Sequence, residues 1–490
     1  MTADQLATAS GRPINRTERE GLRVYWTETD GPFQATLTFR VGFADEALPL
    51  RGISHLVEHL AISPKRRLYE YNGWAGISTT GFWASGRPEE ALGYLEGVSR
   101  SLSELPLDRL GGELRILRTE SSGRGTALVH ALISARCGVR SYGAAAMDEF
   151  ALNHVDADAV RAWSKRHFVS ENAVLILSGA PADDLRLELG HGQSLALPEP
   201  TRIAGLDLPT CIAAGYGAVA AGFLVERGPA TGVALAALAE RLTVRLRHEL
   251  GLSYGVWTDY EPFGERHAHL TIAADCTDDG VEQVMDAMLH TLDQLADHGP
   301  DAQDVAHEVE RFQRMLDTPR DAVGWYATGE LVGVAPERLA ESAAATARVT
   351  PEDVAAVIGS AMQSMLMLIP AGHRPRPRFR GYPLWSERAV SGRIVRPGGV
   401  IARVLSRKGG LVLGEEGISG LWGDGTITTV RWADCEAVLV FPDGTVVVIG
   451  CDGDRITVPV RVFGVARTTE LRQEIEKNVP GDRLVPMPAD

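Results

Sequence analysis

The five residues His55-Leu-Val-Glu-His59 combine side chains that can bind a metal ion and move a proton. In a helix, His55 and His59 lie one turn apart on the same side, and Glu58 lies beside them. Two imidazoles at this spacing can hold one zinc ion, and the carboxylate can accept a proton from water that the ion binds. The motif therefore predicts a zinc site with Glu58 as general base. The alternative is a pair of histidines that are exposed to solvent or satisfied within the core.

Apolar residues around the motif indicate which side of this helix enters the core. Ile53, Leu56, Val57 and Leu60 recur at helical spacing and form one stripe. The two histidines and Glu58 fall outside that stripe. This separation favours a functional role over a pair of core histidines.

A third protein ligand for zinc is expected from residues 108–120, which have a helical pattern. Glu113 and Glu120 lie two turns apart on one face of that helix, together with Leu110 and Leu117, so the carboxylates are expected to face inward. Buried carboxylates need a partner, and a metal ion is one. The alternative is an ion pair within the helix, with Arg115 or Arg118.

The order of several short motifs resembles the M16 (pitrilysin/insulinase) family of zinc metallopeptidases, in its M16B-like form. The H-x-x-E-H order is the inverzincin signature. The resemblance covers residues 15–372. Besides the histidine motif and the two glutamates, it rests on Gly42-x-x-Asp45-Glu46, Gly52, Tyr142-Gly143, the segment Asn172 to Gly179, and Arg247-x-x-x-Gly251-Leu-x-Tyr254.

The resemblance implies a role for each matching residue. His55, His59 and Glu120 correspond to the zinc ligands, Glu58 to the general base, and Glu113 to an acidic residue that supports a ligand histidine or the ion. In the second half of the family pattern, Arg247 and Tyr254 correspond to a pair that binds the substrate and stabilises the oxyanion. Without the family, this pair is an ordinary helix-end arginine and strand tyrosine.

The sequence departs from the family pattern in two places. Only 61 residues separate His59 from Glu120, a short interval for the family, and Trp74-Ala75-Gly76 stands where a cleft strand usually carries Asn-Ala. These differences concern specificity and efficiency more than metal binding. His267 and His269 share a face of a predicted strand without a nearby third ligand, and we interpret them as surface histidines.

The elements that must position these residues follow from the apolar pattern. Residues 21–27, 33–41 and 173–177 are expected to be strands, and residues 51–62, 89–105, 108–120 and 156–167 helices. The helix-then-strand pattern of residues 156–179 recurs at 350–369, about 193 residues later. It predicts an α+β fold with two related α/β sandwich halves of the M16 type, at residues 15–195 and 202–372. Residues 193–201 and 373–380 are the expected connectors.

The last hundred residues have a different pattern, with short β-rich runs separated by turns such as Pro442-Asp-Gly444. Runs are expected at residues 399–405, 410–413, 426–432, 436–441, 445–449 and 455–460, and a helix at 468–478. About seven strands closed by a helix resemble a pleckstrin-homology-like barrel, which we assign to residues 391–484.

Composition excludes several functions. The 490-residue chain carries a net charge of −15, which argues against a general nucleic-acid or anionic-membrane binder. Its five cysteines are far apart and lack a CxxC pair, which is typical of reduced thiols. The polar start has no apolar signal region. Two uncharged runs, at residues 208–225 and 354–372, contain prolines and polar residues and are interpreted as buried elements. A cytoplasmic protein without a transmembrane segment is expected.

The preferred hypothesis is a zinc endopeptidase or oligopeptidase that hydrolyses peptides or unstructured segments. By resemblance, such chains work as homodimers or as heterodimers with a related M16 chain. The alternative is a catalytically weak or inactive M16-like subunit that binds peptides or serves as a scaffold in a heterodimeric processing peptidase. The C-terminal module would serve interaction or regulation, because fold alone does not fix its function.

Overall fold

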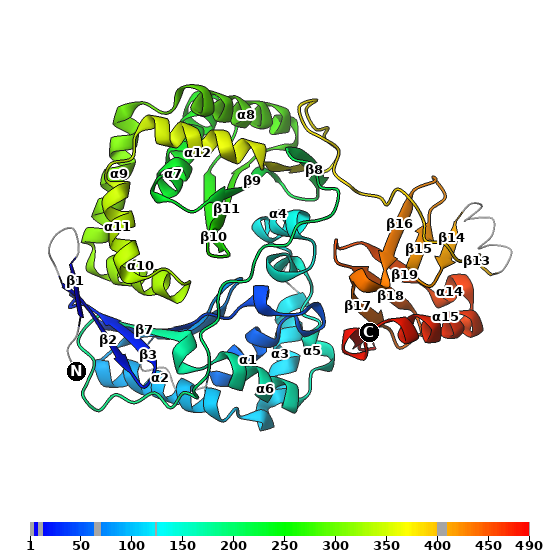
Figure 1. Ribbon diagram of the computed structural model, residues 1–490, viewed down its shortest axis with the longest axis horizontal. Helices are drawn as coiled ribbons and strands as arrows, with labels where there is room; N and C mark the ends of the chain where they lie inside the picture. The colour runs from blue at the N-terminus through cyan, green and yellow to red at the C-terminus, as the bar shows by residue number, and fades with distance from the viewer. Residues whose placement is uncertain (1–3, 8–12, 63–69, 123–124, 399–408, 490) are drawn as a thin grey trace.

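The computed structural model describes residues 4–7, 13–62, 70–122, 125–398 and 409–489 (Figure 1). Its first half is built on a seven-stranded sheet with the order β1-β2-β3-β7-β4-β6-β5. Strand β5 lies at one edge of this sheet, so one side of its backbone is left for another chain to pair with. The strands are β1 (Asp4–Ala7), β2 (Pro13–Arg19), β3 (Leu22–Trp26), β4 (Phe33–Phe39), β5 (Glu70–Ala75), β6 (Thr80–Gly86) and β7 (Ala173–Leu177).

Helices pack on one face of this sheet and form its main core. The apolar stripe of α1 (Ile53–Ala61), from Ile53 to Leu60, is fully buried there, as the spacing predicts. Asp156 caps α6 by accepting a hydrogen bond from the Ala159 amide at 2.8 Å. The other helices of this half are α2 (Pro88–Ser103), α3 (Leu110–Ser122), α4 (Leu128–Cys137), α5 (Ala151–His154) and α6 (Ala157–His167), with short 3-10 turns η1 (Phe43–Asp45), η2 (Leu48–Leu50), η3 (Leu107–Arg109), η4 (Ser141–Ala146) and η5 (Ser170–Asn172).

The second half contains a five-stranded sheet with the order β10-β11-β9-β12-β8. Its strands are β8 (Thr210–Ala214), β9 (Ala218–Glu226), β10 (Val256–Phe263), β11 (His267–Asp275) and β12 (Leu366–Pro370). Its helical elements are α7 (Pro229–Thr243), the π-helical η6 (Val244–Glu249), η7 (Asp278–Gly280), α8 (Val281–His298), α9 (Ala302–Asp317), α10 (Pro319–Leu331), α11 (Pro336–Thr346) and α12 (Pro351–Gln363).

The two halves share one topology. In the first, β4 leads through α1 to the hairpin β5–β6; in the second, β9 leads through α7 to the hairpin β10–β11. Helix α6 precedes β7, which pairs parallel with β3 and antiparallel with β4. Helix α12 precedes β12, which pairs in the same way with β8 and β9. The helix-then-strand repeat in the sequence therefore marks equivalent positions in two related units.

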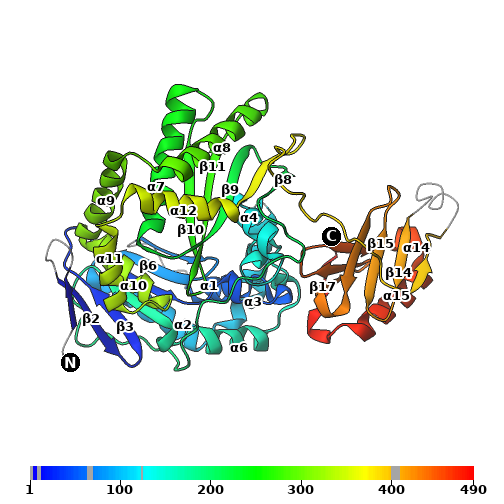
Figure 2. The same ribbon diagram turned by 45° about the horizontal axis from the view of Figure 1, so that its top comes forward.

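Each half sends one helix onto the sheet of the other. Helix α10 packs against β2, β3 and β7, where Val323 and Tyr326 join Tyr25 in one apolar cluster. Helix α4 packs against β9 and β12, with Leu132 in a cluster on the second sheet. Figures 1 and 2 show α10 beside β3 and α4 beside β9. The halves are therefore braced at two separate places.

Each brace carries buried polar contacts. At the first, Arg16 donates to Glu330 of α10 at 2.9 and 2.6 Å, and the Tyr25 hydroxyl donates to the same carboxylate. At the second, Arg136 of α4 donates to the carbonyls of Gly222 at 3.0 Å and Ser364 at 2.6 Å. These contacts fix the position of one half relative to the other.

The two uncharged runs form helix and strand segments, as predicted, but only β9 and β12 are largely buried, whereas Ala213 of β8 and Ala356 of α12 are exposed. The first forms β8 and β9, and the second forms α12 and β12. In the described part of the chain, no helix is both long and apolar enough to cross a membrane.

The C-terminal region is β-rich but differs from the predicted barrel. Its strands form two four-stranded sheets, and among the described residues neither sheet closes on itself. A further strand, β20, follows the helix that was expected to end the domain, and it pairs parallel with β17. The run expected at residues 399–405 lies outside the described residues. The elements are β13 (Arg393–Val395), β14 (Gly410–Leu413), β15 (Gly417–Leu421), β16 (Ile427–Arg431), η8 (Trp432–Asp434), β17 (Cys435–Val440), β18 (Val446–Gly450), β19 (Arg455–Val458), α14 (Val460–Phe463), α15 (Val465–Asn478), η9 (Gly481–Arg483) and β20 (Leu484–Pro486).

Candidate metal centre

Helix α1 presents His55, Glu58 and His59 as one cluster. Their ligand atoms lie within 4.8 Å of one another, and the two imidazole rings are perpendicular with centroids 4.9 Å apart. His55 and Glu58 are buried, and His59 is partly exposed. A cluster of this size can close on a single ion.

Each histidine has a carboxylate on the ring nitrogen that faces away from the cluster. His55 Nδ1 lies 2.9 Å from Glu149 Oε1, and His59 Nδ1 lies 3.3 Å from Glu113 Oε2. A carboxylate at Nδ1 favours the tautomer that leaves the Nε2 lone pair available to a metal. Both imidazoles therefore have the support that zinc-binding histidines usually have.

The Nε2 atoms face two further carboxylates. Glu58 Oε2 lies 4.0 Å from His55 Nε2 and 3.8 Å from His59 Nε2. Glu120 Oε2, from α3, lies 3.6 Å from His59 Nε2. Two nitrogens and a carboxylate from a second helix form the donor set that suits zinc.

Glu113 is itself held in place. Arg109 binds its second oxygen at 2.5 Å and also donates to the carbonyls of Leu60 and Ile62 at the end of α1. The sequence alternative expected an ion pair with Arg115 or Arg118. The ion pair of Glu113 is instead made by Arg109, and Arg118 donates to the Leu152 carbonyl. Arg109 ties α3 to the end of the helix that carries the histidines.

Burial and neighbouring charges shift the pKa values in this cluster. Burial alone would lower the pKa of His55, but the Glu149 carboxylate and its acidic neighbours raise it. Burial and the adjacent His55 lower the pKa of His59. Burial would raise the pKa of Glu149, but its hydrogen bond with His55 lowers that pKa to about 2. Glu149 therefore stays ionised and keeps its role as an acceptor.

Glu58 lies against the edge strand β5. A Cβ added to Gly73 would lie 2.1 Å from Glu58 Oε1, so any larger residue at this point of the strand would displace the Glu58 carboxylate. Trp74, the departure from the family pattern, is 36% exposed on the same strand. The carboxylate is therefore next to backbone that another chain can pair with.

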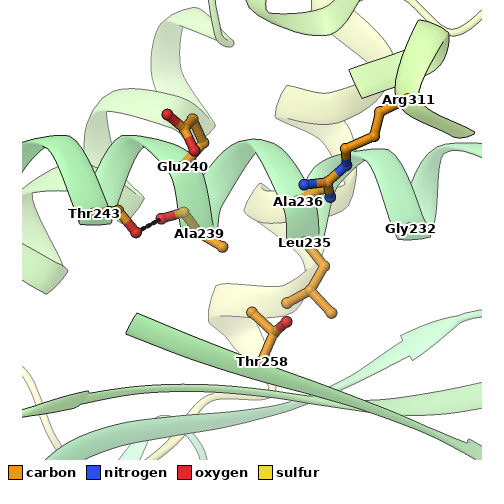
Figure 3. A pocket seen from close by; sticks show the side chains of 8 residues that line it. All are labelled: Gly232, Leu235, Ala236, Ala239, Glu240, Thr243, Thr258 and Arg311. Carbon is orange, nitrogen blue, oxygen red and sulfur yellow. Dashed lines mark hydrogen bonds between the residues drawn. The ribbon is translucent and has the colours of Figure 1, made fainter. Parts of the chain in front are cut away.

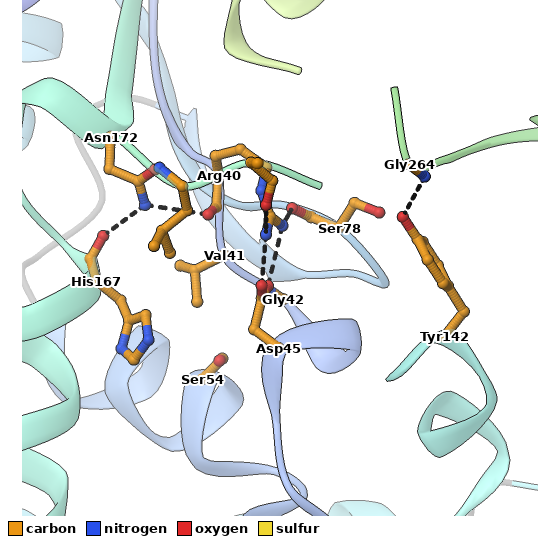
Figure 4. Close-up of polar contacts among 12 residues, drawn as sticks. Arg40, Val41, Gly42, Asp45, Ser54, Ser78, Tyr142, His167, Asn172 and Gly264 are labelled. Atoms are coloured by element: carbon orange, nitrogen blue, oxygen red, sulfur yellow. Dashed lines mark hydrogen bonds and ion pairs between the residues drawn. The ribbon is translucent and has the colours of Figure 1, made fainter. Parts of the chain in front are cut away.

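The motif Gly42-x-x-Asp45-Glu46 shapes the chain before α1. Asp45 accepts hydrogen bonds from Arg40 and from the Gly42 amide (Figure 4). Glu46 accepts from the amides of Gly52 at 2.8 Å and Ser54 at 2.9 Å, where α1 begins. An acidic side chain there satisfies amides that the helix leaves unpaired and favours its N-terminal dipole. These residues fix the start of the histidine helix.

Arg247 and Tyr254 lie on the second half. Arg247 belongs to the π-helical segment η6, and its guanidinium lies 5.2 Å from the centre of the Tyr254 ring. Tyr254 is 81% exposed. Asp275 fixes the loop by accepting hydrogen bonds from Ser253 and from the Gly255 amide. Arg247 and Tyr254 therefore lie next to each other, as the family resemblance implies for a pair that acts together.

Two contacts connect the turn after β5 and the Tyr142-Gly143 motif to the second half. Ser78 donates a hydrogen bond to Glu261 of β10. The Gly264 amide donates to the Tyr142 hydroxyl at 2.9 Å, as Figure 4 shows. Tyr142 also stacks on Phe263. These contacts hold the β5–β6 turn and η4 of the first half against the end of β10 and the residue that follows it.

His269 is not a surface histidine, contrary to the sequence interpretation. It is fully buried on β11, stacks on Phe263 with ring centroids 5.2 Å apart, and burial holds its pKa well below the usual value. Helix α4 covers this face of the second sheet through Leu132, so an alternating strand pattern does not lead to solvent here. His267 is partly exposed.

A cavity of about 260 Å³ lies elsewhere, on the second half (Figure 3). Residues of α7, Thr258 of β10 and Arg311 of α9 line it. Helix α7 is the counterpart of α1 but contains no histidine. Of these two equivalent helices, α1 carries the histidine pair and α7 does not.

Sequence reasoning did not find Glu149. It lies 94 residues from His55, in the segment between η4 and α5, and no spacing rule connects the two. Arg109 was also missed, although its position four residues before Glu113 is a recognisable helix pair.

Comparison with known proteins supports a common fold. Residues 218–312 match the family described as the peptidase M16 inactive domain. The matched range contains Arg247 and Tyr254 but none of the residues of the histidine cluster. No curated protein sequence matches the chain.

Solved structures similar to this chain include M16 proteins and proteases. A peptidase M16 inactive domain from Pseudomonas fluorescens aligns over 77% of this chain and 100% of its own, with a TM-score of 0.59 and 14% identity. A protease from Helicobacter pylori aligns over 75% of this chain and 99% of its own, with the same TM-score and identity. Pitrilysin aligns over 77% of this chain and 47% of its own, with a TM-score of 0.57 and 14% identity. The chain therefore has the fold of the M16 peptidases.

Proposed function

We propose that this protein is a zinc-dependent endopeptidase or oligopeptidase. One observation carries the proposal: both imidazoles of α1 are held at Nδ1 by carboxylates, both Nε2 atoms lie within 4.0 Å of Glu58, and Glu120 lies 3.6 Å from the Nε2 atom of His59. An ordinary pair of helix histidines has no need of four surrounding carboxylates. The arrangement fits a catalytic zinc site with an open position for water.

The donor set suits zinc in number and kind. His55, His59 and Glu120 would hold the ion, and Glu149 and Glu113 would orient the imidazoles. When bound, zinc acidifies water and polarises the carbonyl of a peptide bond. The roles of His55, His59, Glu120 and Glu113 are those that the family resemblance implies, and Glu149 is added by its contact with His55.

Glu58 is placed to move the proton. Its carboxylate lies beside both Nε2 atoms and against Gly73 of β5, so a peptide lying along that strand would bring its scissile bond near this group. Glu58 would accept a proton from the attacking water and deliver it to the leaving amine. An extended segment can add to the free edge of β5, which favours peptides and unstructured regions over folded proteins.

The second half would contribute Arg247 and Tyr254. An arginine and a tyrosine hydroxyl can both stabilise the oxyanion that forms when a peptide carbonyl is attacked. Tyr254 is exposed and can approach a bound chain. Two such chains, as a homodimer or as a heterodimer with a related M16 chain, would complete the enzyme. A cytoplasmic location and an interaction or regulatory role for residues 391–484 belong to the same proposal.

A second candidate is a catalytically weak or inactive subunit that binds peptides or acts as a scaffold in a heterodimeric processing peptidase. The match of residues 218–312 to a domain described as inactive favours it, as does Trp74 in place of the usual cleft residue. The two candidates differ in whether this chain cleaves peptides by itself.

The test is zinc stoichiometry together with cleavage of a peptide library, followed by mass spectrometry. Wild type is expected to bind one zinc per chain and to cleave. Glu58→Gln should keep the zinc and lose activity at least about a hundredfold, because general-base catalysis contributes 10²–10⁴-fold. Glu104→Gln, at an exposed position after α2 and away from β5, is the matched control and should stay active. Full activity of Glu58→Gln would falsify the mechanism, and zinc binding without cleavage would favour the second candidate.

A further inference from the structure

The C-terminal domain packs against the segment of the first half that carries Glu149. Phe150 is 1% exposed and Leu48 is 1% exposed, and both lie in one apolar cluster with residues of the C-terminal domain. Figure 1 places β17 on the side of the first half that contains α5. The residues that the C-terminal domain contributes to this cluster are Ala437, Leu439, Ile449 and Val485.

Close backbone contacts fix this interface. The Val139 amide donates to the Cys451 carbonyl at 2.9 Å, and Arg140 donates to Glu436 at 2.6 Å. A Cβ on Gly138 would lie 1.9 Å from the Cys451 oxygen, and Gly138 also has a φ of +74°. Only glycine permits this approach. The domain is therefore seated in one defined position.

The interface leads directly to the candidate metal centre. Glu149 is the residue before Phe150, and its oxygens contact His55 Nδ1 at 2.9 Å and the Ser121 hydroxyl at 2.5 Å. Leu48 lies three residues before Arg51. The Arg51 guanidinium lies 3.6 Å from Glu149 and donates to the Ala144 carbonyl at 3.0 Å. Each of these two short segments thus places an apolar side chain in the interface; one also carries Glu149, which contacts His55, and the other carries Arg51, which contacts Glu149.

Both segments are also anchored within the first half. The Ala151 amide donates to the Arg51 carbonyl at 3.0 Å, and His154 Nε2 lies 2.9 Å from the Pro49 carbonyl oxygen. Residues 147–150 connect a 3-10 turn to the four-residue helix α5, and η2 is a three-residue turn, and such short elements depend on packing for their conformation. Burial of Phe150 and Leu48 against the C-terminal domain is therefore one of the contacts that hold these segments in place.

We infer that the C-terminal domain is a structural part of the metal centre: through Phe150 and Leu48 it positions Glu149, which in turn orients His55. Glu149 is a positioning residue, because it acts on the metal through the imidazole. This inference rests on the proposed zinc site for its functional meaning, but it concerns the contact from the C-terminal domain to His55. A domain that only docked partners would leave the metal centre unaffected.

The first test measures zinc affinity of the full-length chain by competition with a chelator. Glu149→Ala is expected to weaken zinc binding 10–100-fold, the usual effect of removing the partner of a ligand histidine. Glu149→Gln, which keeps an oxygen acceptor, should lose less. Leu439→Ala in the C-terminal domain should weaken binding about tenfold, although it lies outside the metal centre. Ile394→Ala is the matched control: it truncates an aliphatic side chain of the same domain that is 57% exposed.

The double variant decides whether Leu439 acts through Glu149. If it does, Leu439→Ala should add little to the loss already caused by Glu149→Ala, because both changes break the same connection. If the double variant loses zinc affinity by the product of the two single losses, the inference is overturned. So would an unchanged affinity in both Leu439→Ala and Phe150→Leu, provided that circular dichroism shows them folded.

A second measurement needs no metal. In protein labelled with ¹⁵N-histidine, the His55 ring nitrogens report which tautomer is present, and the signal is assigned by its loss in His55→Gln. At a pH above the raised pKa of His55, where the ring is neutral, wild type should show one tautomer with the proton on Nδ1, and Leu439→Ala should show both. If zinc does not bind but this dependence is seen, the proposed function fails and the positioning role holds. If zinc binds and neither affinity nor tautomer responds to Leu439→Ala, the positioning role fails by itself.

Discussion

Replacing Glu330 with alanine should loosen helix α10 from the first sheet. The Glu330 carboxylate accepts two hydrogen bonds from Arg16, at 2.9 and 2.6 Å, and one from the Tyr25 hydroxyl. The side chains of Arg16 and Glu330 are 21% and 13% exposed. Truncating one partner of a buried ion pair costs ~3–5 kcal/mol because the other partner is left unpaired. Since Arg16 keeps some access to water, we take the lower end, ~3 kcal/mol.

The assay is hydrogen exchange, read by mass spectrometry on peptides from α10 and β3. A loss of ~3 kcal/mol in local opening free energy accelerates exchange roughly 150-fold. Glu330→Gln keeps an acceptor but loses the charge, so its effect should be about half as large in free energy, ~1.5 kcal/mol. Glu337→Ala, at an exposed site on α11, should leave exchange unchanged.

The effect should also depend on pH. Burial alone would raise the pKa of Glu330, but the hydrogen bonds from Arg16 and Tyr25 lower it below the ordinary 4.5. The stabilisation is therefore complete above pH 4.5 and is lost as the pH falls through the lowered pKa. The difference between wild type and Glu330→Ala should shrink on acidification. Unchanged exchange in α10, or an equal rise in α15 of the C-terminal domain, would refute the view that this contact braces the halves.

Three other substitutions test separate parts of the structure. Arg136→Met removes two hydrogen bonds to carbonyls of the second half and should destabilise the other brace by ~2 kcal/mol, seen as faster exchange in β9 with α10 unaffected. Burial raises the pKa of Glu261 to about 7, so the folded state binds more protons than the unfolded state between pH 4.5 and 7. Stability should therefore fall as the pH rises through that range, by at most about 3 kcal/mol, and Glu261→Gln should abolish this slope in urea unfolding at pH 5 and 8. Glu120→Gln should weaken zinc binding at least about tenfold in chelator competition while the fold is retained, and unchanged affinity would remove Glu120 from the ligand set.

The sequence was most informative where one local element determines the geometry. The spacing of Ile53 to Leu60 predicts both the helix and its buried side, so the common orientation of His55, Glu58 and His59 follows from it. The repeat of residues 156–179 at 350–369 also marked equivalent elements, because caps and buried strands are encoded locally.

Features that arise from tertiary packing could not be predicted in this way. Glu149 reaches His55 only because the chain returns after 94 residues, and His269 is buried only because a helix from the other half covers its sheet. Strand β20 has three residues and one of them is Pro486, so no alternation marks it. Strand β15 contains two glycines among five residues and lacks a strand-like pattern.

The exchange of helices α4 and α10 between the halves has a consequence for synthesis of the chain. The first sheet contains all its strands once β7 has been made, but the face bearing Tyr25 stays uncovered until residues 319–331 leave the ribosome. The nascent first half therefore carries an exposed apolar surface while more than a hundred further residues are added. Separately expressed halves would each present such a surface, and mixing them should restore a soluble pair, as in a split protein.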